Sequence, residues 1–319
     1  MKFHTGVPMS GPTYDPAAIS AIVRKADEVG FDYVGGAERL IMPRVIESKY
    51  PRGTGEIPGV GTGQNMLEAQ SVMSFMAGQT KRIRFMPFFV VPCRNPILAA
   101  KMLATIDVLS NGRLSILIGP GWNREEAAAM MVTTPWAKRG AVTNEYLRAF
   151  TELWSKEDPE FHGEFLSISE GDFAPKPVQQ PHIPYWIGGE SPAALRRAAL
   201  LGDGWAPAAN NRNYLLDTTE KFTSAVDSIK RRGESAGRDM SGFGVRWGGL
   251  SWNGGDPNAG TGGDRKRFTG TAEQVAEDVR EQAKLGVTNM SAGSSADSLS
   301  GKLEMMESFA TEVVPLVSG

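Results

Sequence analysis

The segment Trp186–Pro192 has the composition of a strand-to-helix turn that can bind a phosphate group. Gly188 and Gly189 end a short apolar run, and Ser191 stands directly before a proline suited to the first turn of a helix. Glycines let a phosphate approach the backbone, and a helix N-terminus offers free N–H groups at the positive end of its dipole. A tight turn that binds nothing is the alternative. Glu190 favours that alternative unless its carboxylate points away from the phosphate.

A second glycine-rich turn follows the strand expected over Arg113–Ile118. Its residues are Gly119, Pro120, Gly121 and Trp122. The two glycines could pass close to a flat ring. As a dinucleotide fingerprint the turn is weak, because Arg124 occupies the third glycine position and no first Rossmann strand precedes it.

A proline interrupts the apolar segment Ile83–Val91. Proline cannot donate to a sheet ladder, so Pro87 implies a bulge or a break that could re-aim the backbone toward a ligand. A plain core strand that ends early is equally open. The aromatic candidates for an apolar pocket wall are Phe88, Phe89, Trp122, Trp247 and Trp252. Core packing explains most such residues.

The remaining ionisable residues indicate no metal site and no Ser-His-Asp arrangement. A single cysteine excludes an internal disulfide, and we expect Cys93 to be a small buried residue. His4 lies on the first expected strand and could point into a site at the strand ends. Arg246 is unusual in a barrel strand: facing inward it should meet an anion, and facing outward it would be ordinary surface.

The elements that must position these residues alternate between short β-rich runs and longer stretches of helical periodicity. Strands are expected at Lys2–Pro8, Phe31–Gly35, Ile83–Val91, Arg113–Ile118, Tyr185–Gly188, Gly204–Pro207, Phe243–Ser251 and Val287–Ala292. Helices are expected at Ala17–Val29, Asn65–Gln79, Pro96–Leu109, Thr143–Trp154, Pro192–Leu201, Tyr214–Ala236, Ala272–Leu285 and Lys302–Val314. Such pairs with right-handed crossovers predict an α/β fold, a (β/α)8 TIM barrel with insertions, as one domain over residues 1–319. A doubly wound open sheet is the competing architecture.

Three long inserts are placed by this pattern. Gly36–Gly63 and Asn253–Gly270 leave the C-terminal ends of strands, where barrel enzymes build their sites. The second of them is a lid ordered by ligand or a merely flexible loop. Lys156–Pro184 follows a helix, so we expect it on the opposite, structural face.

Composition excludes several classes of protein. The chain has 319 residues, a formal net charge of −2, 41% apolar and 22% charged residues, which suits a globular protein with a large core. A balanced charge gives no electrostatic case for nucleic acid. No run approaches the roughly 18 apolar residues of a membrane span. The first residues do not have the pattern of a signal peptide, so we expect a cytoplasmic enzyme.

Five segments in order along the chain resemble one known family. They are Glu38–Arg44, Arg94–Pro96, Leu103–Leu114, Gly119–Asn123 and Ile187–Gly189. The pattern resembles the luciferase-like oxidoreductases, closest to an actinobacterial branch assigned to the deazaflavin coenzyme F420. The resemblance implies a deazaflavin ring in the barrel mouth and a homodimer. It also implies the cofactor phosphate at Gly188-Gly189 and a non-proline cis peptide near Pro87-Phe88 behind the ring.

One departure from the family pattern concerns the end of the second strand. The family has Asp-His there, with the histidine over the redox centre, and this chain has Glu38-Arg39. Arg39 cannot exchange a proton near neutral pH, but it could hold negative charge that develops on the ring or the substrate. A local Glu38–Arg39 ion pair without a catalytic part is the alternative. Trp122 replaces an acid of the sugar-phosphate dehydrogenases, which disfavours a sugar phosphate.

These observations lead to one expected function and two alternatives. We expect an F420-dependent oxidoreductase that transfers a hydride between the deazaflavin and a small organic substrate. A monooxygenase that takes reduced FMN from a separate flavin reductase, and a non-catalytic flavin-binding barrel, remain open. The expected catalytic residues are Glu38 and Arg39. The expected cofactor-binding residues are Glu38, Arg39, Pro87, Phe88, Phe89, Gly119, Pro120, Gly121, Trp122, Gly188, Gly189, Glu190 and Ser191.

Overall fold

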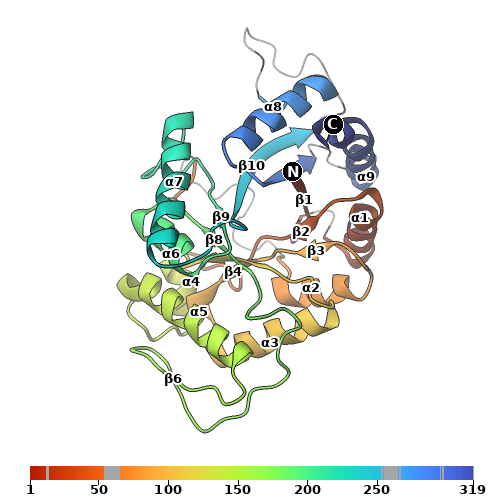
Figure 1. The fold of residues 1–319 in the computed structure, drawn as a ribbon. Coiled ribbons are helices and arrows are strands. Elements are labelled where there is room, and N and C mark those ends of the chain that lie inside the picture. The colour runs from red at the N-terminus through yellow and green to blue at the C-terminus, as the bar shows by residue number, and fades with distance from the viewer. Residues whose placement is uncertain are drawn as a thin grey trace.

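A curled parallel sheet surrounded by helices dominates the computed structural model, which describes residues 1–11, 14–53, 65–252, 254, 265, 267–294, 296 and 298–318 (Figure 1). The sheet has nine strands in the order β3-β2-β1-β11-β10-β9-β8-β5-β4, and every neighbouring pair is parallel. The strands are β1 (Lys2–Gly6), β2 (Tyr33–Gly35), β3 (Arg84–Phe85), β4 (Phe88–Val90), β5 (Ile116–Gly119), β8 (Tyr185–Gly188), β9 (Gly204–Ala206), β10 (Gly244–Trp252) and β11 (Asn289–Ser294). A short antiparallel pair, β6 (Phe161–His162) and β7 (Ser167–Ile168), stands apart.

The two ends of the strand order belong to one chain segment. β3 and β4 are separated only by Met86 and Pro87, and Phe85 forms a bridge with Leu114 just before β5. The carbonyl of Pro87 still accepts a hydrogen bond from the Leu117 N–H at 2.9 Å. The predicted break at Pro87 is therefore confirmed, and the sheet curls into a TIM-barrel-type fold instead of an open doubly wound one.

The predicted cis peptide between Pro87 and Phe88 is wrong. Among the described residues, the cis bonds are those before Pro175 and Pro181. Proline already breaks the strand, and the trans bond leaves the Phe88 N–H free to donate to the Gly36 carbonyl at 3.0 Å.

Helices cover the outer face of the sheet. They are α1 (Pro16–Val29), α2 (Ala69–Ala77), α3 (Pro96–Leu109), α4 (Arg124–Ala129), α5 (Arg139–Ser155), α6 (Pro192–Leu201), α7 (Thr219–Ser235), α8 (Ala272–Lys284), α9 (Leu299–Ser308) and α10 (Val314–Ser318). Side chains cap several of these helices: Asp15 accepts from the first turn of α1, Ser191 caps α6, and Thr271 forms a capping box with Gln274.

Helix ends differ from prediction where a side chain caps inside the periodic segment. α2 begins after Glu68, which accepts from Gln70 and Ser71, and α7 begins after Thr218, which accepts from Lys221. A capping residue has an extended backbone itself, and its side chain accepts from the first N–H groups of the helix. The cap therefore fixes the first residue of the helix, even where the apolar spacing typical of a helix begins earlier in the sequence. The last predicted helix is divided by a π-helical turn at Phe309–Val313.

The core lies between the sheet and the helices. Its largest fully buried side chains include Trp154, Trp205, Trp252, Tyr185, Phe85 and Phe89. Trp252 packs edge-on against Phe309, with 6.4 Å between the ring centres. Trp247 packs edge-on against Phe222, with 5.0 Å between the ring centres. Both tryptophans therefore belong to the core, which corrects the expectation that they line a pocket.

The insert 156–184 lies at the N-terminal ends of the strands, on the side opposite the cavity, as predicted. In the segment 156–184, Gln179 donates from its backbone to Asp107 and from Nε2 to the Leu114 carbonyl at 2.6 Å, beside the N-terminal end of β5. This confirms its place on the structural face. The expected lid Asn253–Gly270 lies mostly outside the described residues, as do positions 54–63 of the other insert. Over the described ranges, no helix combines the length and apolarity that crossing a bilayer requires.

Asp27 fixes α1 to the start of β3 and makes stability depend on pH. Its carboxylate accepts from the backbone N–H groups of Lys81, Arg82 and Ile83, at 3.0, 3.1 and 2.6 Å. Burial acts to raise the pKa of Asp27, but the three backbone donors and the Arg82 charge together lower it by more. The pKa of Asp27 therefore lies below its ordinary value. A carboxylate whose pKa is lower in the native state than in the unfolded state stabilises the fold at pH values above the unfolded pKa. This stabilisation is lost as the pH falls through the native pKa.

We therefore expect Asp27→Asn to lower the free energy of unfolding by about 1 kcal/mol at pH 7, after allowance for solvent screening. The difference from the parent protein should shrink toward pH 3. Urea unfolding at both pH values measures it. Glu28→Gln, on the exposed side of α1, is the control and should change little. A deficit that grows toward pH 3 would contradict the assigned role.

Candidate active site

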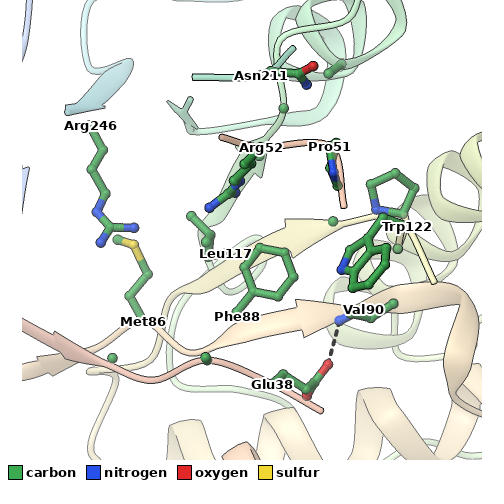
Figure 2. A pocket seen from close by; sticks show the side chains of 18 of the residues that line it. Glu38, Pro51, Arg52, Met86, Phe88, Val90, Leu117, Trp122, Asn211 and Arg246 are labelled. Carbon is green, nitrogen blue, oxygen red and sulfur yellow. Dashed lines mark hydrogen bonds between the residues drawn. The ribbon is translucent and has the colours of Figure 1, made fainter. Parts of the chain in front are cut away.

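A cavity of about 700 Å³ opens at the C-terminal ends of the barrel strands. Its walls come from residues within β1, β2, β4, β5, β8 and β11 and from the segments that follow several of these strands. This volume falls within the usual range for sites that enclose a small-molecule ligand. Figure 2 shows part of it, with Phe88 and Leu117 in the centre, Glu38 below and Arg52 and Arg246 above.

Most of the residues singled out in the sequence meet at this cavity. Its lining includes Glu38, Arg39, Phe88, Gly119, Pro120, Gly121, Trp122, Gly188, Gly189, Glu190 and Ser191. The two glycine-rich turns and the Glu38-Arg39 pair, far apart in the chain, therefore border one space. Their roles toward a cofactor stay predictions.

Pro87 and Phe89 do not line the cavity, which corrects their expected place in the site. Successive side chains of a strand point to opposite faces. Since Phe88 points into the cavity, Phe89 points outward into the core, where the Arg94 guanidinium lies 4.7 Å from its ring centre.

The turn after β8 has the geometry of a phosphate seat. Gly189 has φ of 98°, in the region that favours glycine, and Ser191 caps α6 by accepting from the Ala194 N–H at 3.2 Å. The first turn of α6 borders the cavity. Glu190 is turned aside: its carboxylate accepts from the Ala208 N–H and from Asn211 Nδ2. The sequence analysis allowed a phosphate at this turn only if the Glu190 carboxylate points away from it, and these two hydrogen bonds hold the carboxylate to the loop after β9.

Two arginines that the sequence analysis missed stand beside this seat. Arg197 of α6 donates to Asn144 Oδ1 at 2.5 Å and to the Gly140 carbonyl at 2.9 Å. Arg139, at the start of α5, donates to the Gly121 carbonyl at 3.2 Å. Burial lowers the pKa of Arg197 to about 10 and also lowers that of Arg139, yet both remain charged at neutral pH.

These two guanidinium groups are held by neutral oxygens, and in the described part of the chain neither pairs with a carboxylate. Their charge therefore adds to the positive end of the α6 dipole. An anion at the cavity edge would find the peptide N–H groups and two fixed cations together. Nothing in the sequence marks this, because the arginines come from two helices packed side by side.

Glu38 does not pair with Arg39. Its buried carboxylate accepts from the Val90 N–H at 2.7 Å, the dashed line in Figure 2, and lies 2.6 Å from Arg94 Nη2. Burial raises the pKa of Glu38 above its ordinary value, although the Arg94 charge and the Val90 N–H oppose this. The Arg39 guanidinium donates to the Glu38 backbone carbonyl at 3.2 Å and lies 3.4 Å from the Glu126 carboxylate. The alternative of a local Glu38–Arg39 ion pair is therefore wrong.

Several buried polar atoms at the cavity have no partner in the part of the chain that the structure describes. They are Nε of Arg39, Nε1 of Trp122, Nε2 of His4 and Nε of Arg246. The Arg39 guanidinium lies 5.0 Å from the Trp122 ring centre, so these two form one wall. Each unsatisfied buried group costs about 1–3 kcal/mol. Four around one space indicate a place where a ligand supplies hydrogen-bonding partners.

His4 and Arg246 lie near the barrel axis. Burial, with a contribution from the Arg246 charge, holds the pKa of His4 well below its usual range, so the imidazole is neutral at physiological pH. Its ring stacks on Tyr33 at 5.6 Å. Arg246 faces inward and donates to Ser291 Oγ at 2.5 Å. Of the two orientations considered for Arg246 in the sequence analysis, the structure therefore shows the one that faces into the barrel.

Cys93 is buried, as expected, and burial raises the pKa of its thiol to about 12. The thiolate, which is the reactive form, is therefore negligible at neutral pH. Across the described residues, no group of three or more histidine, cysteine, aspartate or glutamate side chains is placed to hold a metal ion.

Comparison with known proteins gives a family and a fold. A family model described as luciferase-like monooxygenase matches residues 1–250. The FMNH2-dependent dimethylsulfone monooxygenase of Pseudomonas putida is 28% identical over 176 residues, which cover 54% of this chain and 46% of that protein. The match thus spans about half the length of that relative.

Two solved structures share the fold over nearly their whole length. The monooxygenase RslO1 from Streptomyces bottropensis has a TM-score of 0.75 at 20% identity, with 99% of both chains covered. The coenzyme F420-dependent tetrahydromethanopterin reductase from Methanopyrus kandleri has a TM-score of 0.74 at 18% identity, with 98% of both chains covered.

Proposed function

Because this chain belongs to the luciferase-like monooxygenase family, we propose that it is an F420-dependent oxidoreductase acting on a small organic substrate. In this reaction a hydride passes between the deazaflavin and that substrate. The observation that carries the proposal is the union, in one cavity, of a phosphate seat and a wall of unpartnered donors. A solved reductase with this fold uses F420, which supports the choice of cofactor.

The residues present fit a phosphorylated cofactor with a flat ring system. The N–H groups at the start of α6, with Arg197 and Arg139, would hold the phosphate, and Gly189 keeps the backbone approachable. The Gly119–Trp122 turn and Arg39 would border the rings. When bound, the cofactor supplies the redox chemistry, and the protein supplies orientation and exclusion of water.

Glu38 and Arg39 have separate parts in this proposal. Arg39 keeps its positive charge at neutral pH and can stabilise negative charge on the ring or the substrate, but it cannot exchange a proton. Glu38 acts as a positioning residue, because its carboxylate fixes the end of β4 through the Val90 N–H.

The second candidate is a monooxygenase that uses reduced FMN from a separate reductase. The FMNH2-dependent relative favours it. A flavin-binding barrel without catalysis is the third. Titration of the purified protein with F420, FMN and anaerobically reduced FMN, followed by fluorescence, separates the first two candidates, and turnover of a substrate by the loaded protein separates both from the third. We expect F420 to bind at least tenfold more tightly than either form of FMN. Tight binding of reduced FMN alone would support the second candidate, and binding of neither cofactor would overturn both.

We expect Arg197→Met to weaken F420 binding about 10–100-fold, because a charge-assisted hydrogen bond contributes about 1.5–3 kcal/mol. The matched control is Arg196→Met, the exposed neighbour on the same helix. The deazaflavin riboside without its phosphate should bind both variants like the parent. Isothermal titration measures the affinities. Equal losses for the phosphorylated and phosphate-free ligands would place the phosphate elsewhere.

The homodimer and the cytoplasmic location stay predictions. Apolar side chains on the outer surface of α2 and α3 are exposed, among them Phe75, Ile97, Leu98 and Leu109. Sedimentation equilibrium of the purified protein would measure the oligomeric state.

A further inference from the structure

A second compartment of about 450 Å³ adjoins the main cavity on the side of β9 and β10. The two spaces share Tyr50, Arg52, Phe88, Leu117 and Arg246 as lining residues. None of the residues of the phosphate seat borders the second compartment. A ligand part that enters here is therefore separate from the phosphate.

Arg246 stands at the boundary of the two spaces with its charge uncompensated. Within the described residues, its guanidinium hydrogen-bonds only to the neutral Ser291 hydroxyl, and its buried Nε has no partner. Burial, with the Arg52 charge, lowers the pKa of Arg246 to about 10, so the guanidinium is still charged at neutral pH. A half-buried cation that has no counter-charge among the described residues marks a site where an anionic ligand can complete the pair.

The acids around the cavity are already engaged. Glu38 pairs with Arg94, and Glu126 binds Arg39 and the Leu40 N–H. Glu190 is bound by the loop after β9. His4, which also faces Arg246, is neutral. Within the described ranges, no carboxylate therefore forms an ion pair with Arg246.

Arg52 brings a second cation to the same place. Its segment is fixed to the loop after β9 by a bridge to Asn211, with Gly53 N–H donating to the Asn210 carbonyl at 3.2 Å. Figure 2 shows Arg52 above Leu117 and Phe88, and Arg246 to its left with its guanidinium next to Met86; both arginines line the second compartment. No salt bridge of Arg52 is among those of the described residues. Two like charges held together repel unless an anion lies between them.

The compartment also has an apolar surface, beside the polar side chains of Tyr50 and Asn210. Phe88 and Leu117 border it, together with Ala206 and Pro207. A ligand that fits both features has an apolar body and one oxyanion group. A sugar or another ligand rich in hydroxyl groups would leave its own polar groups unpaired against this surface.

We propose that Arg246 and Arg52 form the anion subsite of the substrate pocket, so that the substrate is a small organic acid, a carboxylate or a sulfonate, with an apolar body against Phe88 and Leu117. This rests on the proposed function, since it names the substrate class of that same site. The arginines bind the acid group by charge-assisted hydrogen bonds and leave its apolar part at the boundary with the ring-binding space.

The test uses the cofactor-free protein and isothermal titration with pairs of probes. Benzoate and benzenesulfonate are compared with benzamide, and hexanoate with hexanol. We expect the acids to bind at least tenfold more tightly than their neutral partners. Arg246→Met and Arg52→Met should each lower the acid affinity at least tenfold, and Arg246→Lys should retain part of it. Arg44→Met, an exposed arginine in the same insert, is the charge-matched control and should change nothing.

The outcomes separate this inference from the proposed function. Acid binding should survive Arg197→Met, and F420 binding should survive Arg246→Met, because the two subsites are separate. Acids that bind while F420 does not would support the subsite and count against the proposed cofactor. Equal binding of acids and amides, or loss of F420 binding in Arg246→Met with acid binding intact, would overturn the inference.

Discussion

Arg94→Met is expected to lower the free energy of unfolding by about 3–5 kcal/mol at pH 8, the usual cost of leaving a buried charge unpaired. Arg94 Nη2 lies 2.6 Å from Glu38 Oε1 and 3.0 Å from Glu68 Oε1, and the Glu38 side chain is 1% exposed. Methionine fills similar volume over the Phe89 ring but removes the charge. The Glu38 carboxylate then keeps only the Val90 N–H.

The deficit should become smaller as pH falls. The pKa of Glu38 is already raised above its ordinary value of 4.5 by burial, and loss of the Arg94 charge removes the largest opposing effect. A carboxyl whose native pKa exceeds its unfolded pKa takes up a proton on folding, so folding is favoured as pH falls through the native pKa. The slope is about 1.4 kcal/mol per pH unit between the two pKa values. Relative to the parent protein, the variant should therefore be closer in stability at pH 5 than at pH 8.

Urea unfolding of both proteins at the two pH values measures this. Lys25→Met is the control, because the Lys25–Glu307 pair lies on the surface, where solvent screens the attraction and the pair should contribute little to stability. The double variant Glu38→Leu with Arg94→Met should recover much of the loss, since an apolar pair can replace a buried ion pair of similar volume. An Arg94→Met deficit that is the same at pH 5 and pH 8 would show that Glu38 does not carry it.

Local patterns were enough to predict the barrel and the geometry of the turn after β8, whose binding of phosphate stays a prediction. The apolar run, two glycines and Ser191 that form the seat are contiguous, so the chain itself fixes their geometry. The strand-helix alternation likewise depends on neighbours in sequence. Pro87 predicted its break for the same reason: a missing N–H acts at its own position.

The charges of the site could not be predicted in this way. Glu38 meets Arg94 across 56 positions, and Arg39 meets Glu126 across 87. A long flexible side chain reaches many partners, and only the packed barrel decides which one lies within range. The error at Phe89 has a different origin: both sides of this strand are apolar, so the pattern did not show which face each ring takes.

Gly189→Val is expected to weaken F420 binding at least 100-fold, a loss of about 2.8 kcal/mol of binding free energy. Gly189 has φ of 98°, and a Cβ there would lie 3.3 Å from the Ala194 Cβ at the start of α6. A valine side chain would occupy the space through which a phosphate reaches the helix N–H groups. The left-handed backbone also costs a branched residue about 1–2 kcal/mol of stability.

These two effects are separated by a second glycine. Gly237, after α7, has φ of 77° and nothing within 4 Å of an added Cβ. Gly237→Val should therefore carry a similar loss of stability and leave F420 affinity unchanged. The deazaflavin riboside without phosphate should bind Gly189→Val more nearly as it binds the parent protein, because the blocked contact is the one with phosphate. If Gly189→Val bound F420 like the parent, the helix N-terminus would not be the phosphate site, and Arg197 and Arg139 would need another ligand to explain their uncompensated charge.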